Sequence, residues 1–544
     1  MSRLLSIRDL VIEGYQDERW NGIVHGVSLD LDKGEVLGLI GESGAGKSTI
    51  GIASMGYTKA GCRIVSGSIN FDGQELCGAN AETLRKLRGP RIAYVAQSAA
   101  ASFNPAHKLT QQFAETAVQE GVMTYAEAEH KAIELFRRLD LPDPDNIGNR
   151  YPHQVSGGQL QRCMVAMAMA CNPDLIVFDE PTTALDVTTQ IEVLGAIREI
   201  IAAYNTAAIY ITHDLAVVAQ IADRIMVLRH GKEVETGETR AMLENPREEY
   251  TRALLSVRRS RGDNVDHGEQ DTILEIDNVT AAYANTVVVL DGVSTKITKG
   301  ETVSVVGESG SGKSTLARVI TGLLPPMGGE IRFHGEVVTP RLRDRSKEFL
   351  RRVQMIYQMP DTALNPRHRV GKTIGRPLEF YFDMTRDQRR ERVLELLDKI
   401  ELGEKYADRL PSELSGGEKQ RVCIARALAA EPELIICDEI TSALDQLVAE
   451  GILKLLQNLQ NELKVSYLFI THDLDTVKAI SDEIVVMYQG KVVEQGRKED
   501  ILSPPYEPYT DLLLSSAPEM DPDWLDRVMD HRRELAKQGV NLNT

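Results

Sequence analysis

A glycine-rich segment that ends in Lys-Ser-Thr occurs twice in the 544-residue chain. The copies consist of Gly41, Glu42, Ser43, Gly44, Ala45, Gly46, Lys47, Ser48 and Thr49, and of Gly307, Glu308, Ser309, Gly310, Ser311, Gly312, Lys313, Ser314 and Thr315. Glycines in such a segment let backbone N–H groups close around phosphate oxygens, the lysine reaches the outer phosphates, and the first serine after the lysine ligates Mg²⁺. A glycine-rich turn with an exposed lysine explains one such match, but two matches in register favour a phosphate-binding loop in each copy.

Two apolar runs farther along the chain end in paired carboxylates, Asp179-Glu180 and Asp438-Glu439. Because buried parallel strands deliver side chains at their carboxyl ends, we assign Asp179 and Asp438 to Mg²⁺. Glu180 and Glu439 are then the general bases that polarise an attacking water. An acidic strand end that caps the next helix is the alternative, and the phosphate-binding loop in the same copy disfavours it.

The elements that must position these residues can be located from the same pattern. Each phosphate-binding loop comes after an apolar run, residues 35–40 or 301–306, which predicts a strand, a loop and a helix in that order. Capping boxes predict two more helix starts, at Ser156, Gly157, Gly158 and Gln159 and at Ser415, Gly416, Gly417 and Glu418. The two glycines leave N–H groups that could bind a phosphate, although ordinary capping explains the serine equally well.

All of these segments recur in the same order about 260 residues later, a period far too long for a solenoid. The repeat predicts two homologous domains, residues 1–257 and 273–517, joined by a polar linker at 258–272. Residues 518–544 form a C-terminal tail with a short helix that begins near Asp521-Pro522. We expect this helix to cap the second domain rather than to bind a partner.

Composition excludes several classes of protein. With 62 basic and 80 acidic residues the formal net charge is −18, the wrong sign for a protein that coats nucleic acid. No apolar run approaches the roughly 18 residues that span a bilayer, and the first residues do not resemble a signal peptide, so we expect a cytosolic chain. The six cysteines form no Cys-x-x-Cys pair and no cluster with histidine, so we expect no zinc.

The phosphate-binding loop, the Ser-Gly-Gly segment, the Asp-Glu pair and a Thr-His-Asp triplet occur in that order twice, and in this the chain resembles the ATP-binding subunits of ABC transporters over residues 1–517. The resemblance implies an α/β fold: two tandem P-loop NTPase domains of ABC type, each with a mainly parallel core sheet, an antiparallel β subdomain and a helical subdomain. The implied ligands are ATP and Mg²⁺.

Further residues take roles from the resemblance alone. It implies that His213 and His472 contact the γ-phosphate, that Gln97 and Gln358 reach the metal and the reacting water, that Ala184-Leu185-Asp186 and Ala443-Leu444-Asp445 form D-loops, and that Tyr15 and Tyr283 stack on adenine. Trp20 is a neighbouring candidate for the first adenine contact. In such proteins two domains sandwich two ATP molecules head to tail. Lys47 would then share a site with Ser415 and Gly417, and Lys313 with Ser156 and Gly158.

The segments at 97–105 and 358–366, and the ends of both domains around Tyr250-Thr251 and Tyr509-Thr510, resemble dipeptide, oligopeptide and nickel importers. Val155 replaces the usual leucine before the first signature, and Ile440 replaces the usual proline after Glu439, but neither change removes a reacting group. Many members of this branch carry a cysteine cluster after the ATPase core, and this chain has none there, so no iron–sulfur cluster is expected. Because both copies keep lysine, glutamate and histidine, we expect two hydrolysis-competent sites.

The resemblance implies an ATPase that drives an importer of peptides or a related small solute, peripheral on the cytoplasmic face of the inner membrane. Its implied partners are two transmembrane permeases and a periplasmic or lipid-anchored substrate-binding protein, with the two ATPase domains pairing within the chain and no nucleic acid bound. One alternative is a soluble tandem ABC ATPase that acts on ribosomes or nucleic acid, although the short linker and the missing zinc cysteines count against it. An exporter subunit is a third reading. The cargo, whether peptide, nickel chelate, opine or oligosaccharide, stays open.

Overall fold

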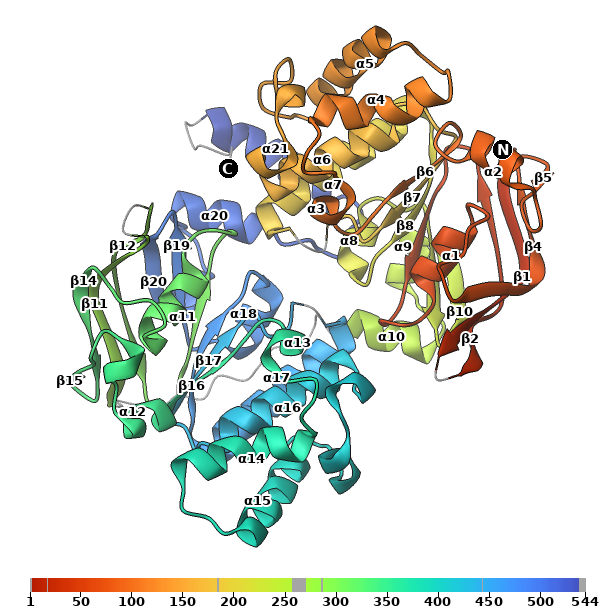
Figure 1. The fold of residues 1–544 in the computed structure, drawn as a ribbon. Coiled ribbons are helices and arrows are strands. Elements are labelled where there is room, and N and C mark those ends of the chain that lie inside the picture. Colours follow the sequence, from red (N-terminus) through yellow and green to blue (C-terminus); the bar gives the residue numbers. More distant parts are fainter. Residues whose placement is uncertain are drawn as a thin grey trace. The chain divides into compact units, whose positions relative to one another are not determined.

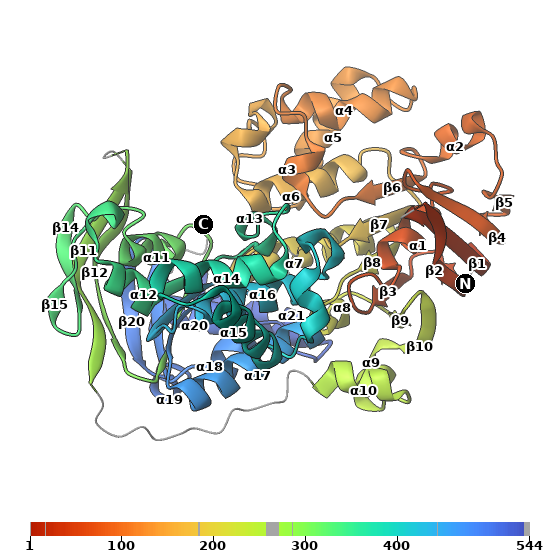
Figure 2. The same cartoon turned by 60° about the horizontal axis from the view of Figure 1, so that its bottom comes forward.

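The computed structural model describes residues 2–16, 18–182, 185–256, 271–284, 287–442 and 444–537. The chain divides into two compact units, which we call the first unit (Met1–Ser256 with Pro518–Thr544) and the second unit (Val257–Ala517). Most of the predicted linker, up to residue 270, lies outside the described residues, and its last residue, Thr272, is the first residue of a strand. Figures 1 and 2 show the elements of each unit.

The first unit contains two sheets. The four-stranded sheet is antiparallel, in the order β2-β1-β4-β5, and consists of β1 (Arg3–Gln16), β2 (Arg19–Asp32), β4 (Cys62–Phe71) and β5 (Gln74–Glu75). The six-stranded sheet has the order β10-β9-β3-β8-β7-β6 and consists of β3 (Val36–Ile40), β6 (Ile92–Val95), β7 (Leu175–Asp179), β8 (Ala207–Ile211), β9 (Arg224–Arg229) and β10 (Lys232–Glu238). Its strands are parallel except for β10.

Helices surround this core sheet and form a subdomain of their own. The helices of the first unit are α1 (Lys47–Ala53), α2 (Ala81–Leu87), α3 (Ala99–Ser102), α4 (Leu109–Gln119), α5 (Tyr125–Arg138), α6 (Gly157–Ala168), α7 (Val187–Tyr204), α8 (Leu215–Ala219), α9 (Thr239–Glu244), α10 (Glu249–Ser256) and α21 (Trp524–Lys537), with 3-10 turns η1 (Ile147–Asn149) and η2 (Pro152–Gln154). Both views show α4 and α5 together over α6, apart from the antiparallel sheet (Figures 1 and 2).

The second unit repeats this plan. Its antiparallel sheet has the order β12-β11-β14-β15 and consists of β11 (Thr272–Tyr283), β12 (Val287–Thr298), β14 (Gly328–Phe333) and β15 (Glu336–Val337). Its core sheet has the order β16-β17-β18-β13-β19-β20 and consists of β13 (Thr302–Val306), β16 (Val353–Ile356), β17 (Leu434–Asp438), β18 (Ser466–Ile470), β19 (Glu483–Tyr488) and β20 (Lys491–Arg497), of which only β20 is antiparallel.

The helices of the second unit match those of the first closely. They are α11 (Lys313–Thr321), α12 (Lys347–Arg352), α13 (Pro360–Ala363), α14 (Val370–Tyr381), α15 (Arg386–Lys399), α16 (Gly416–Leu428), α17 (Gln446–Leu463), α18 (Leu474–Ile480), α19 (Lys498–Ile501) and α20 (Pro508–Ser515), with 3-10 turns η4 (Leu342–Asp344), η5 (Glu404–Asp408) and η6 (Pro411–Glu413). The predicted α/β fold, with a mainly parallel core sheet, an antiparallel subdomain and a helical subdomain in each half, is confirmed.

The strands that carry the predicted chemistry lie in the middle of each core sheet, and most of their residues are apolar. Every residue of β3, β7 and β8 is buried, and so is every residue of β13, β17 and β18. Parallel strands buried on both faces need such continuous apolar runs. The carboxyl ends of these strands therefore meet at one edge of the sheet, and the predicted site residues lie just beyond them.

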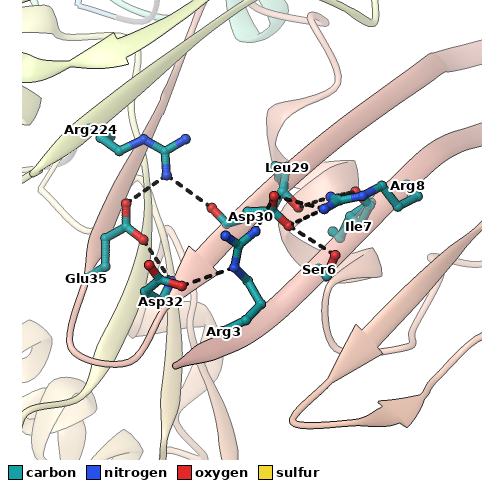
Figure 3. A network of polar contacts seen from close by, with 9 residues as sticks. All are labelled: Arg3, Ser6, Ile7, Arg8, Leu29, Asp30, Asp32, Glu35 and Arg224. Atoms are coloured by element: carbon teal, nitrogen blue, oxygen red, sulfur yellow. Dashed lines mark hydrogen bonds and ion pairs between the residues drawn. The ribbon is translucent and has the colours of Figure 1, made fainter. Parts of the chain in front are cut away.

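A polar network fixes the turn that leads into β3 (Figure 3). Glu35 accepts a hydrogen bond from the backbone N–H of Asp32 at 2.7 Å and one from Arg224 of β9 at 2.8 Å. Arg3 at the start of β1 donates to Asp32 at 3.0 Å. These contacts tie the antiparallel sheet to the core sheet next to the strand that ends in the first phosphate-binding loop.

The C-terminal tail packs on the first unit, so our expectation that it caps the second domain was wrong. Figure 1 shows its helix α21 beside α7. Trp524, Leu525 and Val528 form an apolar stripe that is buried there, but such a stripe does not determine which surface will cover it. Among the described residues, no helix is both long enough and apolar enough to cross a bilayer.

Candidate ATP-binding and hydrolysis sites

The phosphate-binding loops connect β3 to α1 and β13 to α11, as predicted. Gly46 and Gly312, at the N-caps of these helices, have φ of 90° and 105°, a left-handed conformation that glycine adopts without strain. Lys47 Nζ lies 2.7 Å from the carbonyl oxygen of Gly41, and Lys313 Nζ lies 2.8 Å from that of Gly307. Each loop therefore curls around its own lysine ammonium.

The serine after each lysine meets the aspartate at the end of the neighbouring buried strand. Ser48 donates to Asp179 Oδ1 at 2.7 Å, and Ser314 donates to Asp438 Oδ1 at 2.8 Å. The structure thus brings together the hydroxyl and carboxylate oxygens assigned to Mg²⁺ from positions more than a hundred residues apart in the sequence. Burial raises the pKa of Asp438, and the hydrogen bond from Ser314 opposes that shift.

Each predicted general base lies between a glutamine and a histidine. Gln97 donates to Glu180 at 3.0 Å, and Nδ1 of His213 lies 3.3 Å from the other oxygen of that carboxylate. In the second unit Gln358 donates to Glu439 at 2.6 Å, and His472 lies 3.5 Å from it. These residues come one or two positions after strands of the core sheet, so the topology gathers them at one edge.

The electrostatics of these trios depend on burial and on the facing charges. Burial lowers the pKa of His213 and of His472, but the glutamate that each ring faces outweighs burial, so both pKa values lie above the usual value. Burial raises the pKa of Glu439, and the contact with His472 reverses this, so its net pKa is lowered. The carboxylate is thereby kept ionised, as a general base must be.

Glu180 and Glu439 both adopt a positive φ of 50°. A left-handed conformation is uncommon for residues other than glycine and is often stored at functional sites. The next residue is Pro181 in the first unit and the buried Ile440 in the second. Because both glutamates have the same φ, isoleucine in place of the usual proline leaves this backbone conformation unchanged.

Two kinds of tyrosine contact at these sites were not predicted from the sequence. Tyr94 on β6 donates to Asp179 Oδ2 at 2.7 Å, whereas the matching position on β16 is Met355. Tyr250 on α10 accepts a hydrogen bond from the backbone N–H of Glu42 at 3.3 Å, and Tyr509 on α20 accepts one from that of Glu308 at 3.0 Å. The recurrence of Pro-Tyr-Thr or Glu-Tyr-Thr at both domain ends was a signal for the second contact. No local signal marks the first.

In each unit the signature segment lies at the start of a helix, α6 in the first unit and α16 in the second. Ser156 and Gln159 bond each other's backbone N–H groups at 3.3 and 3.2 Å, and Ser415 and Glu418 do the same at 3.3 and 2.7 Å, so both predicted capping boxes are present. The D-loop aspartates, Asp186 and Asp445, are the N-caps of α7 and α17. Ala184 and Ala443 of the predicted D-loops lie outside the described residues.

The predicted adenine-stacking tyrosines differ between the units. Tyr15 is 55% exposed and its ring centroid lies 5.3 Å from that of Trp20, the neighbouring candidate. Tyr283 lies close to its phosphate-binding loop, since its hydroxyl is 3.4 Å from Thr315 Oγ1 and accepts a hydrogen bond from Arg318 at 2.8 Å. Both predicted adenine contacts stay predictions.

Comparison with known proteins defines the class. The family model for ABC transporters matches residues 24–183 and 290–442, and that for the oligopeptide/dipeptide transporter C-terminal region matches residues 234–273 and 493–539. The chain therefore belongs to the ABC transporter family, with two ABC ATPase domains in one polypeptide.

Two relatives align along almost the entire chain. It is 36% identical to the glutathione import ATP-binding protein GsiA of Pectobacterium atrosepticum, over 96% of this chain and 90% of that protein. It is also 36% identical to the peptidoglycan transport ATP-binding protein YejF of Agrobacterium fabrum, over 94% and 96%. Among solved structures, cbiO1 of Clostridium perfringens, part of the ABC transporter complex cbiONQ, is 30% identical with a TM-score of 0.40, covering 43% of this chain and 91% of that one.

Proposed function

We propose that the chain is the energy-coupling ATPase of an importer for peptides or a related small solute. One observation carries this: in each unit a single sheet edge holds a loop lysine, a serine–aspartate pair and a glutamine–glutamate–histidine trio. The oligopeptide/dipeptide transporter match after each ATPase core and the names of the two relatives support the class of cargo.

The phosphate-binding loops would hold the triphosphate through their backbone N–H groups and their lysines. Each lysine ammonium lies within 2.9 Å of two carbonyl oxygens of its own loop, Gly41 and Glu42 or Gly307 and Glu308. A phosphate oxygen carries more negative charge than a carbonyl and forms the shorter, stronger hydrogen bond with an ammonium. The lysine would therefore turn toward the β- and γ-phosphates as they enter the loop.

The residues assigned to Mg²⁺ suit that ion. Ser48 with Asp179, and Ser314 with Asp438, place hard oxygen donors side by side, and Mg²⁺ prefers carboxylate, hydroxyl and phosphate oxygens. Gln97 and Gln358 would add an amide oxygen. Once bound, the ion would neutralise negative charge that develops on the phosphates. The absence of zinc and of an iron–sulfur cluster stays a prediction.

Hydrolysis would use Glu180 and Glu439 as general bases. Each carboxylate would accept a proton from the water that attacks the γ-phosphate, and the adjoining glutamine would help to hold that water. His213 and His472, whose pKa values are raised, would each present an N–H to the γ-phosphate oxygens. This division of roles is the same in both units, which supports two hydrolysis-competent sites.

The signature segments would complete the sites by pairing of the two domains. Ser156 and Gly158 would serve the ATP held by Lys313, while Ser415 and Gly417 would serve that held by Lys47, with Asp186 and Asp445 between the sites. The capped starts of α6 and α16, each with two glycines, support this because they can turn unshielded N–H groups toward a phosphate. ATP binding would close the domains, and hydrolysis would let them reopen.

An importer ATPase of this family works with membrane permeases, and we propose two permease subunits together with a periplasmic or lipid-anchored substrate-binding protein. The chain would then lie on the cytoplasmic face of the inner membrane as a peripheral subunit. The segments after Gln97 and Gln358, which lead into the helical subdomains, are the proposed docking sites for the permeases. Tyr357 and Met359 beside the second glutamine are exposed, as a docking surface requires.

Affinity purification of the tagged chain from detergent-solubilised native membranes, followed by mass spectrometry, tests this proposal. We expect two polytopic permeases at near-equal stoichiometry. A Lys47→Ala, Lys313→Ala double variant, which should assemble but not hydrolyse ATP, provides the matched control. Recovery of ribosomal proteins with no membrane protein would overturn the importer proposal in favour of a soluble tandem ATPase, an alternative that the names of the two relatives already disfavour.

A further inference from the structure

The C-terminal tail ends in a helix that is fixed on the first unit by buried contacts. Gln220, the C-cap residue of α8, is buried, and its side-chain amide donates to the carbonyl oxygens of Glu519 at 2.7 Å and of Asp521 at 3.0 Å. Its amide oxygen accepts a hydrogen bond from the N–H of Leu525 at 3.1 Å. One glutamine therefore satisfies both the turn before α21 and an N–H in the first turn of that helix, which would otherwise lack a partner.

Farther along α21, a buried arginine reaches the helix that comes after the D-loop. Arg532 is 6% exposed and donates to the carbonyl oxygen of Thr188 at 3.1 Å and to Glu192 at 3.3 Å, both on α7. Glu192 also pairs with Arg162 of α6, the signature helix, at 3.4 Å. A chain of charges thus joins α21, α7 and α6.

The same turn of α7 touches the signature itself. The Thr188 hydroxyl and the Thr189 N–H both donate to Asp186, the predicted D-loop aspartate, at 2.8 and 3.0 Å. A Cβ added to Gly158 would lie only 2.1 Å from Cγ2 of Thr189, so α6 and α7 make close contact at the signature. Arg532 therefore bonds the first turn of α7, and that turn contacts both the D-loop aspartate and the signature segment.

The docking site is a property of the first unit alone, as the aligned positions show. The helices α7 and α17 both have 18 residues and begin after an aspartate N-cap, so their positions correspond one to one. Among the described residues, the side chains of the first unit that bond the tail include Glu192, Arg198, Gln220 and Arg240, and their counterparts in the second unit are Gly451, Gln457, Ala479 and Glu499. Gly451, Ala479 and Glu499 cannot make the corresponding bonds, and Gln457 lacks the charge of Arg198.

In the second unit, the arginine of the signature helix pairs with a carboxylate of the same unit. Arg421 of α16 corresponds to Arg162 and pairs with Glu401, which lies just after α15, at 2.7 Å. The arginine of the second signature helix thus has a carboxylate partner that needs no tail. In the first unit the carboxylate is Glu192, which Arg162 shares with Arg532.

We propose that α21 is an intramolecular strap on the first ATPase domain, with Arg532 as a positioning residue that fixes the start of α7 and the signature helix α6. This rests on the proposed function, since both helices bear on hydrolysis only if the signature and D-loop act there. The strap makes the two ATP sites unequal: the site that uses Ser156 depends on the tail, and the site that uses Ser415 does not.

The test compares Arg532→Met with Arg533→Met in the full-length chain. Arg533 is the next residue of α21, is largely exposed and pairs with Asp530 of the same helix, so its variant is the matched control. For Arg532→Met we expect kcat for ATP hydrolysis to fall about fivefold, with little change in KM. Arg532→Lys keeps the charge and should restore part of the loss, which also answers the concern that the methionine variant fails to fold.

Hydrogen exchange supplies a readout that does not depend on activity. In Arg532→Met we expect amide protection to fall in residues 157–161 and 187–191, while the aligned residues 416–420 and 446–450 stay protected as an internal control. Equal effects of the Arg533 and Arg532 variants, or unchanged protection and kcat in Arg532→Met, would overturn the strap. Lost protection in a chain that shows no ATPase activity at all would uphold the strap and refute the proposed function.

Discussion

The hydroxyl of Tyr509 accepts a hydrogen bond from the backbone N–H of Glu308 at 3.0 Å. This contact joins the helix at the end of the second ATPase domain to the second residue of its phosphate-binding loop, and Tyr250 repeats it at Glu42 in the first domain. Ring contacts hold both tyrosines: Tyr509 packs on Tyr488 at 4.4 Å between centroids, and the Arg229 guanidinium lies 4.6 Å from the ring centroid of Tyr250. The segment after each ATPase core thus helps to shape the loop.

We expect Tyr509→Phe to weaken ATP binding at the second loop. The variant leaves the N–H of Glu308 without its acceptor, at a cost of about 1 kcal/mol, which corresponds to a rise of about fivefold in the dissociation constant. Titration calorimetry with ATP and a Glu180→Gln, Glu439→Gln background, which prevents turnover, measures the change. Tyr506→Phe, in the same segment but bonded to Leu502, is the control. Equal affinities in both phenylalanine variants would contradict the assigned role.

Tyr94 gives the first site a metal-side contact that the second site lacks. Tyr94→Phe removes the hydrogen bond that orients Asp179, and loss of such an outer contact costs about tenfold in metal affinity. We therefore expect more Mg²⁺ to be needed for half-maximal ATPase activity. Met355→Phe, at the matching position of the second unit, should leave the Mg²⁺ requirement close to that of the parent chain, and an equal shift in both variants would refute the asymmetry.

A pH-dependent contact supports the strand that carries Asp438. Arg352, just before β16, donates to Glu433, just before β17, at 2.8 Å and holds the pKa of that carboxyl below its usual value, with a smaller contribution from His334. Because the folded pKa is depressed, this stabilisation is present above the unfolded value of about 4.3 and is lost as pH falls through the folded pKa.

We expect Glu433→Gln to cost about 1 kcal/mol of stability at pH 7 and almost nothing near pH 3. Thermal unfolding of the variant and the parent chain across this range measures the difference. Glu391→Gln, at an exposed position on α15, should behave like the parent at every pH. A Glu433 effect that stays constant from pH 7 to pH 3 would show that the ion pair is not its cause.

The fold and most of the site could be predicted because their signals are local. An apolar run that ends in Asp179-Glu180 specifies a buried strand with carboxylates at its carboxyl end, and Ser156 with Gln159 specifies a helix start within four residues. The contacts of Tyr94 and Tyr250 could not be predicted in the same way. Each joins residues that are distant in the sequence, and only the packed sheet brings them together.

The prediction of where the tail packs was wrong for a related reason. The stripe of Trp524, Leu525 and Val528 predicts a docked helix, but apolar contacts carry no information about which domain provides the surface. The information lies in polar differences between the two repeats, such as Gln220 against Ala479 and Glu192 against Gly451. Comparing the repeats position by position, rather than by their shared motifs, would have pointed to the first domain.

The central claim is that both ATP sites, the one with Glu180 and the one with Glu439, hydrolyse ATP. The most direct measurement is the steady-state ATPase rate of the purified chain and of the Glu180→Gln, Glu439→Gln and doubly substituted variants, with unchanged thermal unfolding as a check on folding. If both glutamates act as general bases, each single variant loses a substantial share of the activity, and the double variant falls by about a hundredfold or more. Nearly full activity in either single variant would contradict the claim, because that glutamate would then serve no hydrolytic site.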